Sequence, residues 1–152
     1  MESFIKRYNL STHYTYDVNM NTKKPPVVTQ NGPKAIGPYS VGINAGPFVF
    51  TAGQIGLKPE TGNLAEGGIE AETNQALNNI KEILKAAGSD MSLVVKTTVY
   101  MTDLSDFSKM NDCYGKFFTE NPPARSIAEV KALPRGAKIE IDAIALLSEG
   151  CC

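Results

Sequence analysis

The chain has 152 residues, 42% of them hydrophobic, and a formal net charge of -1, which together fit one soluble domain with a buried core. The nearly balanced charge excludes a long-range positive field of the kind that gathers nucleic acid or an anionic membrane. The longest apolar runs, such as residues 141–147, are much shorter than the roughly 20 residues of a membrane span.

Residues 1–26 are polar, rich in Asn, Thr and Tyr, and show neither helical nor strand periodicity, which predicts a flexible N-terminal arm. Residues 1–10 lack the apolar stretch of a secretory signal. We therefore expect a cytoplasmic protein, with organelle import through the arm as the weaker alternative. The folded domain is expected over residues 27–148, followed by a short C-terminal tail over 149–152.

The three cysteines are Cys113, in a predicted helix, and the terminal pair Cys151 and Cys152. They do not make a disulfide framework, so we expect reduced thiols. A terminal Cys-Cys pair also matches the prenylation signal of some GTPases, but this chain has no GxxxxGK[ST] phosphate loop to support that interpretation.

The first half of the domain predicts two strands and a long helix. Residues 39–44 and 48–52 are β-type runs separated by Ala-Gly-Pro, which has the chemistry of a hairpin turn. A glycine-rich loop follows from residue 53. Residues 69–87 carry apolar side chains at helical spacing, and Gly88 stands where a C-terminal cap belongs.

The second half predicts a strand over the β-branched residues 93–101 and a second helix over 102–118. Asp103 or Ser105 is available as the N-cap of that helix. The closing unit is predicted as a hairpin of residues 125–132 and 138–147. This order of elements predicts an α+β fold, a mixed sheet with two helices on one face.

The last predicted strand has two different faces. Alternation assigns one set of side chains to the helix side and leaves two acids beside two large apolar residues on the other side. Such an open face is unfavourable in a monomer, so we expect a homo-oligomer with polar groups lining clefts between chains. The helix-facing set is Ile139, Ile141, Ala143 and Ala145, and the opposite set is Glu140, Asp142, Ile144 and Leu146.

Arg125 and Glu140 place a guanidinium and a carboxylate in strands that otherwise resemble core. An unpaired buried charge is costly, so each of them needs a partner. A functional site and a structural ion pair between neighbouring strands both satisfy this requirement, and periodicity alone leaves the two interpretations open.

Four segments, AIGPYS, FVFTAGQIGLKPETG, the run from NIKEILKAAG to CYGKFF, and PPARSIAEVKALPRGAKIEIDAIA, resemble the RidA/YjgF family, also called L-PSP endoribonuclease-like. The resemblance covers residues 27–147. It implies a chorismate-mutase-like fold assembled as a homotrimer, with three active sites in the clefts between subunits. The implied activity is hydrolytic deamination of reactive 2-enamine and 2-imine intermediates of the 2-aminoacrylate type to 2-keto acids and ammonia, with no metal and no cofactor.

The resemblance also implies site residues. It places the family's carboxylate-binding arginine at Arg125, its acidic motif residue at Glu140, the tyrosine of its GPY motif at Tyr39 and the cleft asparagine at Asn111. Two substrate-contacting positions depart from the family pattern. Ala52 replaces a serine hydroxyl that many members have, and Ile127 stands where many members have Cys or Thr.

These residue types suit the implied chemistry. The planar fork of Arg125 can donate two parallel hydrogen bonds to a substrate carboxylate and stays charged at any physiological pH. Hydrolysis needs an acceptor for a proton of the attacking water, and Glu140 suits that role. Tyr39 can donate to the substrate or to the water, and Asn111 can fix orientation.

Two other functions stay open at this point. Some family members are described as ribonucleases or translation inhibitors, although this chain has neither a strong positive charge nor paired histidines, its single histidine being His13 in the arm. A non-catalytic sensor could bind small keto or amino acids through the same Arg125, and the change at Ala52 is compatible with binding without turnover.

Overall fold

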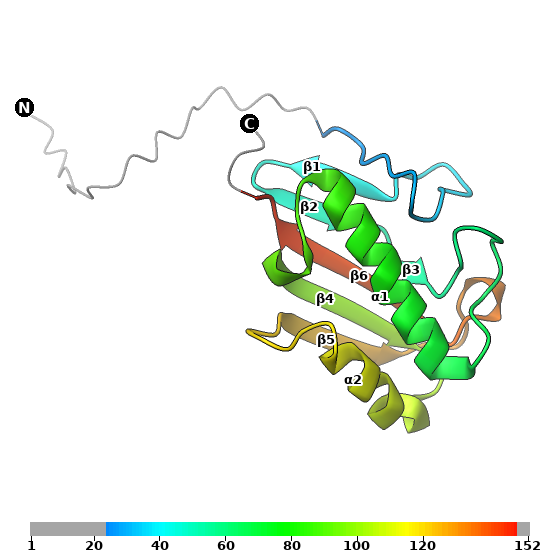
Figure 1. Cartoon of the computed structure of the whole chain (residues 1–152). Helices are drawn as coiled ribbons and strands as arrows, with labels where there is room; N and C mark the ends of the chain where they lie inside the picture. Colours follow the sequence, from blue (N-terminus) through cyan, green and yellow to red (C-terminus); the bar gives the residue numbers. More distant parts are fainter. Residues whose placement is uncertain (1–23, 149–152) are drawn as a thin grey trace, which may run out of the picture.

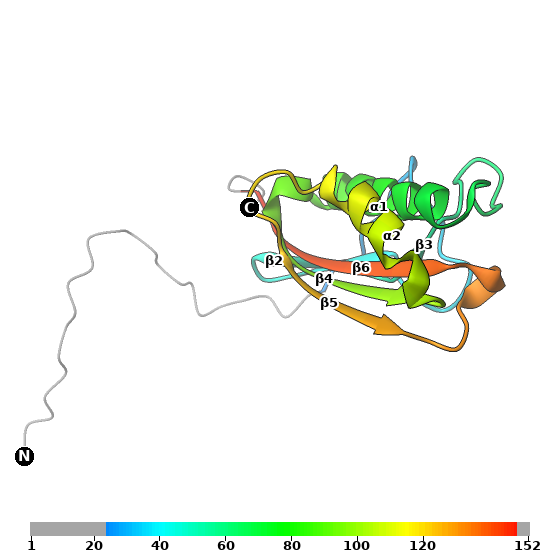
Figure 2. The same ribbon diagram turned by 90° about the horizontal axis from the view of Figure 1, so that it is seen from below.

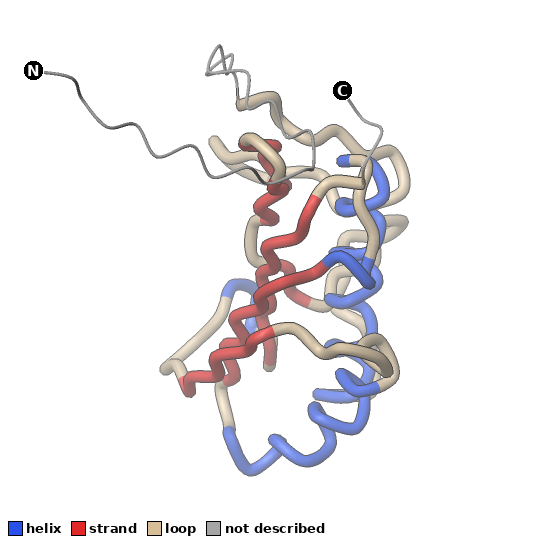
Figure 3. Tube along the Cα trace, turned by 90° about the vertical axis from the view of Figure 1, so that its left-hand side faces the viewer, coloured by secondary structure: helices blue, strands red, loops and turns tan. Residues whose placement is uncertain are grey.

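Two helices cover one face of a mixed sheet, and the helices and the strands form separate layers (Figures 2 and 3). The computed structural model describes residues 24–148 (Figure 1). The predicted arm over 1–26 therefore lies almost wholly outside the described residues. The predicted tail over 149–152, His13 and the terminal cysteines lie wholly outside them.

Helix α1, Gly68–Ala87, packs on the sheet through one apolar stripe. Its residues Leu77, Ile80 and Leu84 are completely buried, and each such side chain stabilises the fold by about 1.5–3 kcal/mol relative to an exposed one. Gly88 ends the helix in the left-handed conformation, φ 84°, which glycine adopts without steric cost. The predicted helix and its cap are confirmed.

The sheet formed by residues 24–148 has six strands, and their order in space differs from their order along the chain. Five of them run β1-β2-β6-β4-β5, and the two-residue strand β3 pairs with β6 beyond the end of β2 (Figure 1). The strands are β1 (Gly42–Ala45), β2 (Phe48–Thr51), β3 (Gln54–Ile55), β4 (Val94–Met101), β5 (Ala124–Glu129) and β6 (Ile139–Leu146).

The predicted closing hairpin is wrong. Strand β5 lies parallel to β4 at the edge of the sheet, and β6 lies antiparallel between β4 and β2. The reason is the helix α2, Phe107–Gly115, which connects β4 to β5: a strand-helix-strand crossover places its two strands parallel and side by side. Strand β6 takes the centre, where its alternate side chains are buried under α1.

The other predicted elements hold with shifted ends. The first strand begins at Gly42 rather than at residue 39, and β3 was not predicted within the glycine-rich loop. The second helix is shorter than expected, because residues Leu104–Asp106 form a separate 3₁₀ turn. Asp103 caps that turn by accepting a hydrogen bond from the Ser105 N–H at 2.8 Å.

The two faces of β6 are as predicted. Ile139, Ile141, Ala143 and Ala145 are buried beneath the helices, and the intervening residues are half-buried or exposed on the open face. The register places Phe48 and Phe50 of β2 opposite Leu146 and Ile144, so these side chains share the open face. Phe50 is 42% exposed and Leu146 is 38% exposed.

Candidate functional site

Five of the six residues expected to form one site line two separate pockets of the chain, and Ile127 lines neither. Arg125 and Asn111 line the first, which we call the arginine pocket and which has a volume of about 460 Å³. Tyr39, Ala52 and Glu140 line the second, which we call the glutamate pocket and which has a volume of about 330 Å³.

Arg125 is held from two sides in the arginine pocket. Its Nη2 donates a hydrogen bond to Asn111 Oδ1 at 2.9 Å, so strand β5 and helix α2 meet there. Its guanidinium carbon lies 4.5 Å from the ring centroid of Tyr114 and 6.0 Å from that of Phe107. Such cation–π contacts contribute roughly 0.5–2 kcal/mol each, more where water is excluded.

Tyr114 is itself fixed in the core. Its hydroxyl and the Thr97 Oγ1 lie 2.7 Å apart in a hydrogen bond between buried side chains. Burial raises the pKa of Tyr114, against the opposing effects of the Thr97 hydrogen bond and of the Arg125 charge. The ring therefore offers a neutral and rigid face to the guanidinium.

Arg125 keeps N–H groups available as hydrogen-bond donors. Within residues 24–148 the one ion pair joins Lys109 to Asp106 at 3.4 Å, so no carboxylate of this part of the chain neutralises Arg125. One Nη2 hydrogen bond to Asn111 and stacking on Tyr114 leave the remaining in-plane N–H groups available. A planar anion such as a carboxylate fits that set of donors.

Glu140 occupies the open face of β6. In the register of the sheet it lies between Ile55 of β3 and Tyr100 of β4. Burial raises the pKa of Glu140, and the nearby charge of Asp142 raises it further. The carboxylate is thus a better proton acceptor than a solvated glutamate, which is the property expected of a general base.

A glycine makes room for this carboxylate. A Cβ atom at Gly53 would overlap Glu140 Oε1 and would lie only 2.7 Å from Glu140 Cδ. The turn that carries Gly53 is held by the buried amide of Gln54, whose Nε2 donates to the carbonyl oxygens of Ala52 and Gly53, both at 3.2 Å. Any residue with a side chain at position 53 would push the Glu140 carboxylate away.

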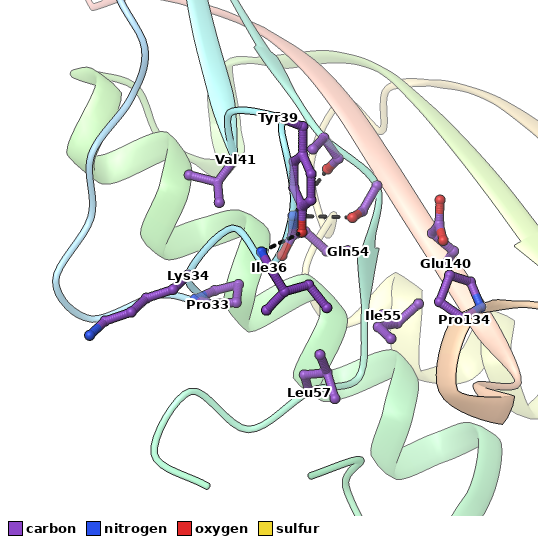
Figure 4. A pocket seen from close by; sticks show the side chains of 12 residues that line it. Pro33, Lys34, Ile36, Tyr39, Val41, Gln54, Ile55, Leu57, Pro134 and Glu140 are labelled. Atoms are coloured by element: carbon purple, nitrogen blue, oxygen red, sulfur yellow. Dashed lines mark hydrogen bonds between the residues drawn. The ribbon is translucent and has the colours of Figure 1, made fainter. Parts of the chain in front are cut away.

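Tyr39 borders the glutamate pocket from the loop that precedes β1 (Figure 4). Its hydroxyl accepts a hydrogen bond from the Ile36 N–H at 3.4 Å, which leaves the phenolic proton free to donate. Ala52 contributes only a methyl group to the lining. The hydroxyl that the resemblance to the family led us to expect at this position is absent.

Ile127 shares the helix side of β5 with Arg125 but packs against the hydrophobic core. It lines neither pocket. Its place in the sheet therefore fits a packing role. The substrate contact expected for Ile127 stays a prediction, and only its main chain could make that contact.

The two pockets lie on opposite faces of the sheet. Arg125 is in register with Thr97, which is in register with Ala143, so all three point to the helix side. Glu140 is three positions from Ala143 and points the other way. Strands β5 and β6 are two strand spacings apart, and Glu140 lies three residues along β6 from the position in register with Arg125. The Cα atoms of Arg125 and Glu140 are therefore roughly 14 Å apart.

This placement overturns the interpretation of Arg125 and Glu140 as an ion pair between neighbouring strands. Strand β4 separates β5 from β6, and the side chains point in opposite directions. Each charge therefore lacks the partner that such a pair would supply within the chain.

Gly53, Tyr114 and Phe107 were not identified as site-forming residues from the sequence. The run TAGQ contains Gly53 and Gln54, but nothing in that run indicates that β6 brings a carboxylate against it. Tyr114 and Phe107 have the spacing of core residues on a helix, which is the more frequent role of such a pattern.

In residues 24–148 no group of three or more His, Cys, Asp or Glu side chains is placed to hold a metal ion. Over the same residues, neither helix combines the length and the apolar character needed to cross a membrane.

Comparison with known proteins gives consistent matches over the folded part. The model of the family described as Endoribonuclease L-PSP matches residues 29–147. A RutC family protein of Pyrococcus horikoshii is 51% identical over 122 residues, which cover 80% of this chain and 97% of the relative. The 2-iminobutanoate/2-iminopropanoate deaminase of Homo sapiens is 47% identical over 79% of this chain and 88% of the relative.

Solved structures share the fold. The crystal structure of E. coli TdcF with bound serine superposes with a TM-score of 0.79 at 41% sequence identity, covering 82% of this chain and 100% of that one.

Proposed function

The chain belongs to the L-PSP endoribonuclease family, and from that premise we propose that it hydrolyses 2-imino acids and their 2-enamine tautomers to 2-keto acids and ammonia. The observation that carries the proposal is Arg125, a guanidinium fixed by Tyr114 and Asn111 with donors left for a small carboxylate. The names of curated relatives from human and mouse support the reaction, and the serine bound in TdcF supports a small amino-acid-like ligand.

Substrate binding begins at Arg125. The carboxylate of the imino acid takes two parallel N–H···O hydrogen bonds from the guanidinium fork, and the aromatic faces of Tyr114 and Phe107 keep the fork in plane. Hydrogen bonds to charged groups contribute roughly 1.5–3 kcal/mol each. Arg125 therefore both holds the substrate and orients its C=N group.

Hydrolysis then consumes one water. The water oxygen bonds to the imine carbon, the C=N π electrons move to the protonated nitrogen, and Glu140 accepts a proton from the water. Glu140 returns that proton to the amine of the resulting carbinolamine, the C–N bond breaks as the C=O bond forms, and the departing ammonia takes up the hydroxyl proton, which gives the 2-keto acid and ammonium. The raised pKa of Glu140 suits it to take the proton in the first step and return it in the second.

Tyr39 is the proposed hydrogen-bond donor of the glutamate pocket. Among residues 24–148 its hydroxyl makes one hydrogen bond, as the acceptor from the Ile36 N–H, so its phenolic proton is free to donate. It can donate to the attacking water or to the oxygen of the carbinolamine. Ala52 has no hydroxyl to share this task, so Tyr39 carries it alone on that side of the pocket.

The complete site is proposed to form between copies of the chain. Arg125 and Glu140 point from opposite faces of one sheet, so a three-carbon substrate cannot reach both within one protomer. The open face that carries Glu140 also exposes Phe50 and Leu146, apolar side chains that a second copy would bury. A cyclic homotrimer with one site at each interface meets both requirements.

A coupled assay tests the proposal. A pyridoxal-phosphate-dependent serine or threonine dehydratase releases the enamine, and the rate of keto-acid formation is measured with and without this protein. We expect acceleration that falls at least about 100-fold in kcat/KM for Arg125→Ala, because two charged hydrogen bonds are lost. Arg125→Lys serves as the matched variant, since it keeps the charge but loses the fork.

The same variants separate the rival functions. RNA cleavage by the purified protein that disappears in Arg125→Ala, without acceleration of keto-acid release, would favour a ribonuclease. Binding of pyruvate without any acceleration would favour a sensor. Either result would contradict the proposed hydrolysis.

A further inference from the structure

We propose that Asn79 and Glu72, two buried polar side chains of helix α1, are positioning residues for Glu140. They fix the main chain of the two strands that meet beside this carboxylate. The inference rests on the proposed function, in which Glu140 is the general base. It goes beyond that function because it assigns a catalytic consequence to residues on the helix side of the sheet, neither of which lines the arginine pocket or the glutamate pocket.

Helix α1 carries a polar stripe in addition to its apolar one. Glu72, Gln75 and Asn79 follow one another at spacings of three and four residues, which places them on one side of the helix. Asn79 is 1% exposed and Glu72 is 5% exposed. Burial of a polar group is costly unless the group is hydrogen-bonded, so the partners of these side chains indicate the role of the stripe.

Asn79 holds strand β3. Its Nδ2 donates to the carbonyl oxygens of Ile55 at 3.2 Å and of Leu57 at 2.8 Å. Gln75 Nε2 donates to Asn79 Oδ1 at 2.9 Å, which fixes the orientation of the amide. Strand β3 has two residues, and its Ile55 is in register with Glu140. So short a ladder has little stability of its own, so the position of β3 against β6 depends on Asn79.

Glu72 holds the beginning of strand β6. Its Oε2 accepts a hydrogen bond from the Lys138 N–H at 2.8 Å, and Lys138 lies directly before β6 and two residues before Glu140. The main chain at Gly56 packs on the same helical residue, since a Cβ atom at Gly56 would lie 2.6 Å from the Glu72 Cα. One helix therefore fixes both strands beside the register pair that contains Glu140.

The two sides of β6 differ in how much support they need. On one side Glu140 is in register with Tyr100 of the eight-residue strand β4, in a long antiparallel pairing. On the other side it is in register with Ile55 of the two-residue strand β3. A displacement of about 1 Å in a catalytic group can cost about 100-fold in rate. The support from α1 is therefore placed where the sheet alone would hold the general base least firmly.

The test compares two hydrogen bonds between the α1 region and the sheet. Asn79→Leu removes the donors to β3 and should lower kcat in the coupled assay by about 10-fold to 100-fold. Its KM should change little, because Arg125 binds the substrate carboxylate from the other pocket. The matched control is Ser89→Ala, which removes the buried hydrogen bond of 2.6 Å from Ser89 Oγ to the Leu146 carbonyl oxygen at the far end of β6. It should lower the melting temperature and leave kcat unchanged.

A conservative variant tests the role of Glu72. Glu72→Gln keeps a side-chain oxygen that can accept from the Lys138 N–H, whereas Glu72→Leu does not. The value of kcat should stay close to that of the parent in the first variant and fall in the second. An equal loss in both would overturn the assignment of Glu72.

A double variant distinguishes positioning from general loss of structure. In a Glu140→Gln background, Asn79→Leu should not lower kcat further, because the group that it positions no longer acts as a base. The same loss in both backgrounds would overturn the inference. So would a folded Asn79→Leu variant with the kcat of Ser89→Ala. Both results would leave the proposed function standing, whereas no acceleration by the parent protein would overturn that function itself.

A milder variant covers the case in which Asn79→Leu does not fold. Gln75→Leu leaves Asn79 in place and removes only the hydrogen bond that orients its amide. It should lower kcat in the same direction by a smaller factor, and thermal melts establish that it folds. An unchanged kcat in folded Gln75→Leu would then overturn the inference.

Discussion

The arginine pocket and the glutamate pocket are built by different means. Arg125 is held by side chains of a helix, through Asn111, Phe107 and the core residue Tyr114. The Glu140 carboxylate instead lies against the main chain at Gly53, in a space that exists only because Gly53 lacks a side chain. The comparison indicates that substrate binding should weaken gradually when contacts in the arginine pocket are altered. Catalysis should instead fall sharply when one methyl group is added in the glutamate pocket.

The largest effect is expected when the charge of Glu140 is removed. Glu140→Gln keeps the shape of the side chain but cannot accept a proton, and the loss of a general base lowers kcat by about 100-fold to 10,000-fold. In the parent protein, activity should decline as the pH falls through the raised pKa of Glu140. In the variant, the residual activity should lack this dependence.

The same substitution should increase stability at neutral pH. Burial raises the pKa of Glu140 in the folded chain above its value in the unfolded chain, so the stability linked to this group is present below the unfolded pKa and is lost as the pH rises through the folded pKa. Denaturant unfolding of Glu140→Gln should therefore show a higher midpoint than the parent above that pKa and no difference at low pH. A lower midpoint at neutral pH would contradict this account of the pocket.

An intermediate effect is expected for Gly53→Ala. The added methyl overlaps the Glu140 carboxylate and displaces it, and a displacement of about 1 Å can cost 100-fold in rate. The melting temperature should change little, because the carboxylate can swing toward solvent. The displaced and better solvated carboxylate should also titrate lower, which would move the acid limb of the pH–rate profile to lower pH.

A double variant distinguishes positioning from general damage. If Gly53 acts by placing the carboxylate, then Gly53→Ala should have no further effect on kcat in a Glu140→Ala background. Additive losses would indicate that the turn has another role.

The smallest effect is expected in the arginine pocket. Tyr114→Leu removes the aromatic face 4.5 Å from the guanidinium carbon, and loss of a cation–π contact predicts a rise in KM of about 2-fold to 30-fold with little change in kcat. Tyr114→Phe keeps the face and loses only the hydrogen bond to Thr97. It should cost about 1 kcal/mol of stability and leave KM unchanged; an equal rise in KM for both variants would show that the ring face is not what positions Arg125.

Patterns in the sequence predicted the parts of the fold that depend on interactions between residues close together in the chain. Helix α1 with its cap at Gly88, and the alternating faces of β6, follow from the spacing of apolar residues. The position of β5 could not be obtained in this way, because strands that follow each other in the chain need not be neighbours in the sheet.

The same distinction between local patterns and contacts of distant segments applies to the candidate site. The resemblance to a family pointed to Arg125, Asn111, Tyr39 and Glu140, and the structure brings Arg125 to Asn111 and places Tyr39 in the same pocket as Glu140. The ion pair between Arg125 and Glu140, one of the two interpretations that periodicity left open, is excluded within one chain because β4 separates their strands. The close approach of Gly53 to Glu140 is a contact between distant segments, which no local pattern contains.

The central claim is that one site combines Arg125 of one protomer with Glu140 of another. Arg125→Ala and Glu140→Ala chains, each inactive alone, can be co-expressed with different affinity tags and purified through both tags. In a cyclic trimer that holds both variants, one of the three interfaces combines an intact Arg125 with an intact Glu140, so we predict about one third of the parent activity. Mixed oligomers no more active than the separate variants would contradict the claim.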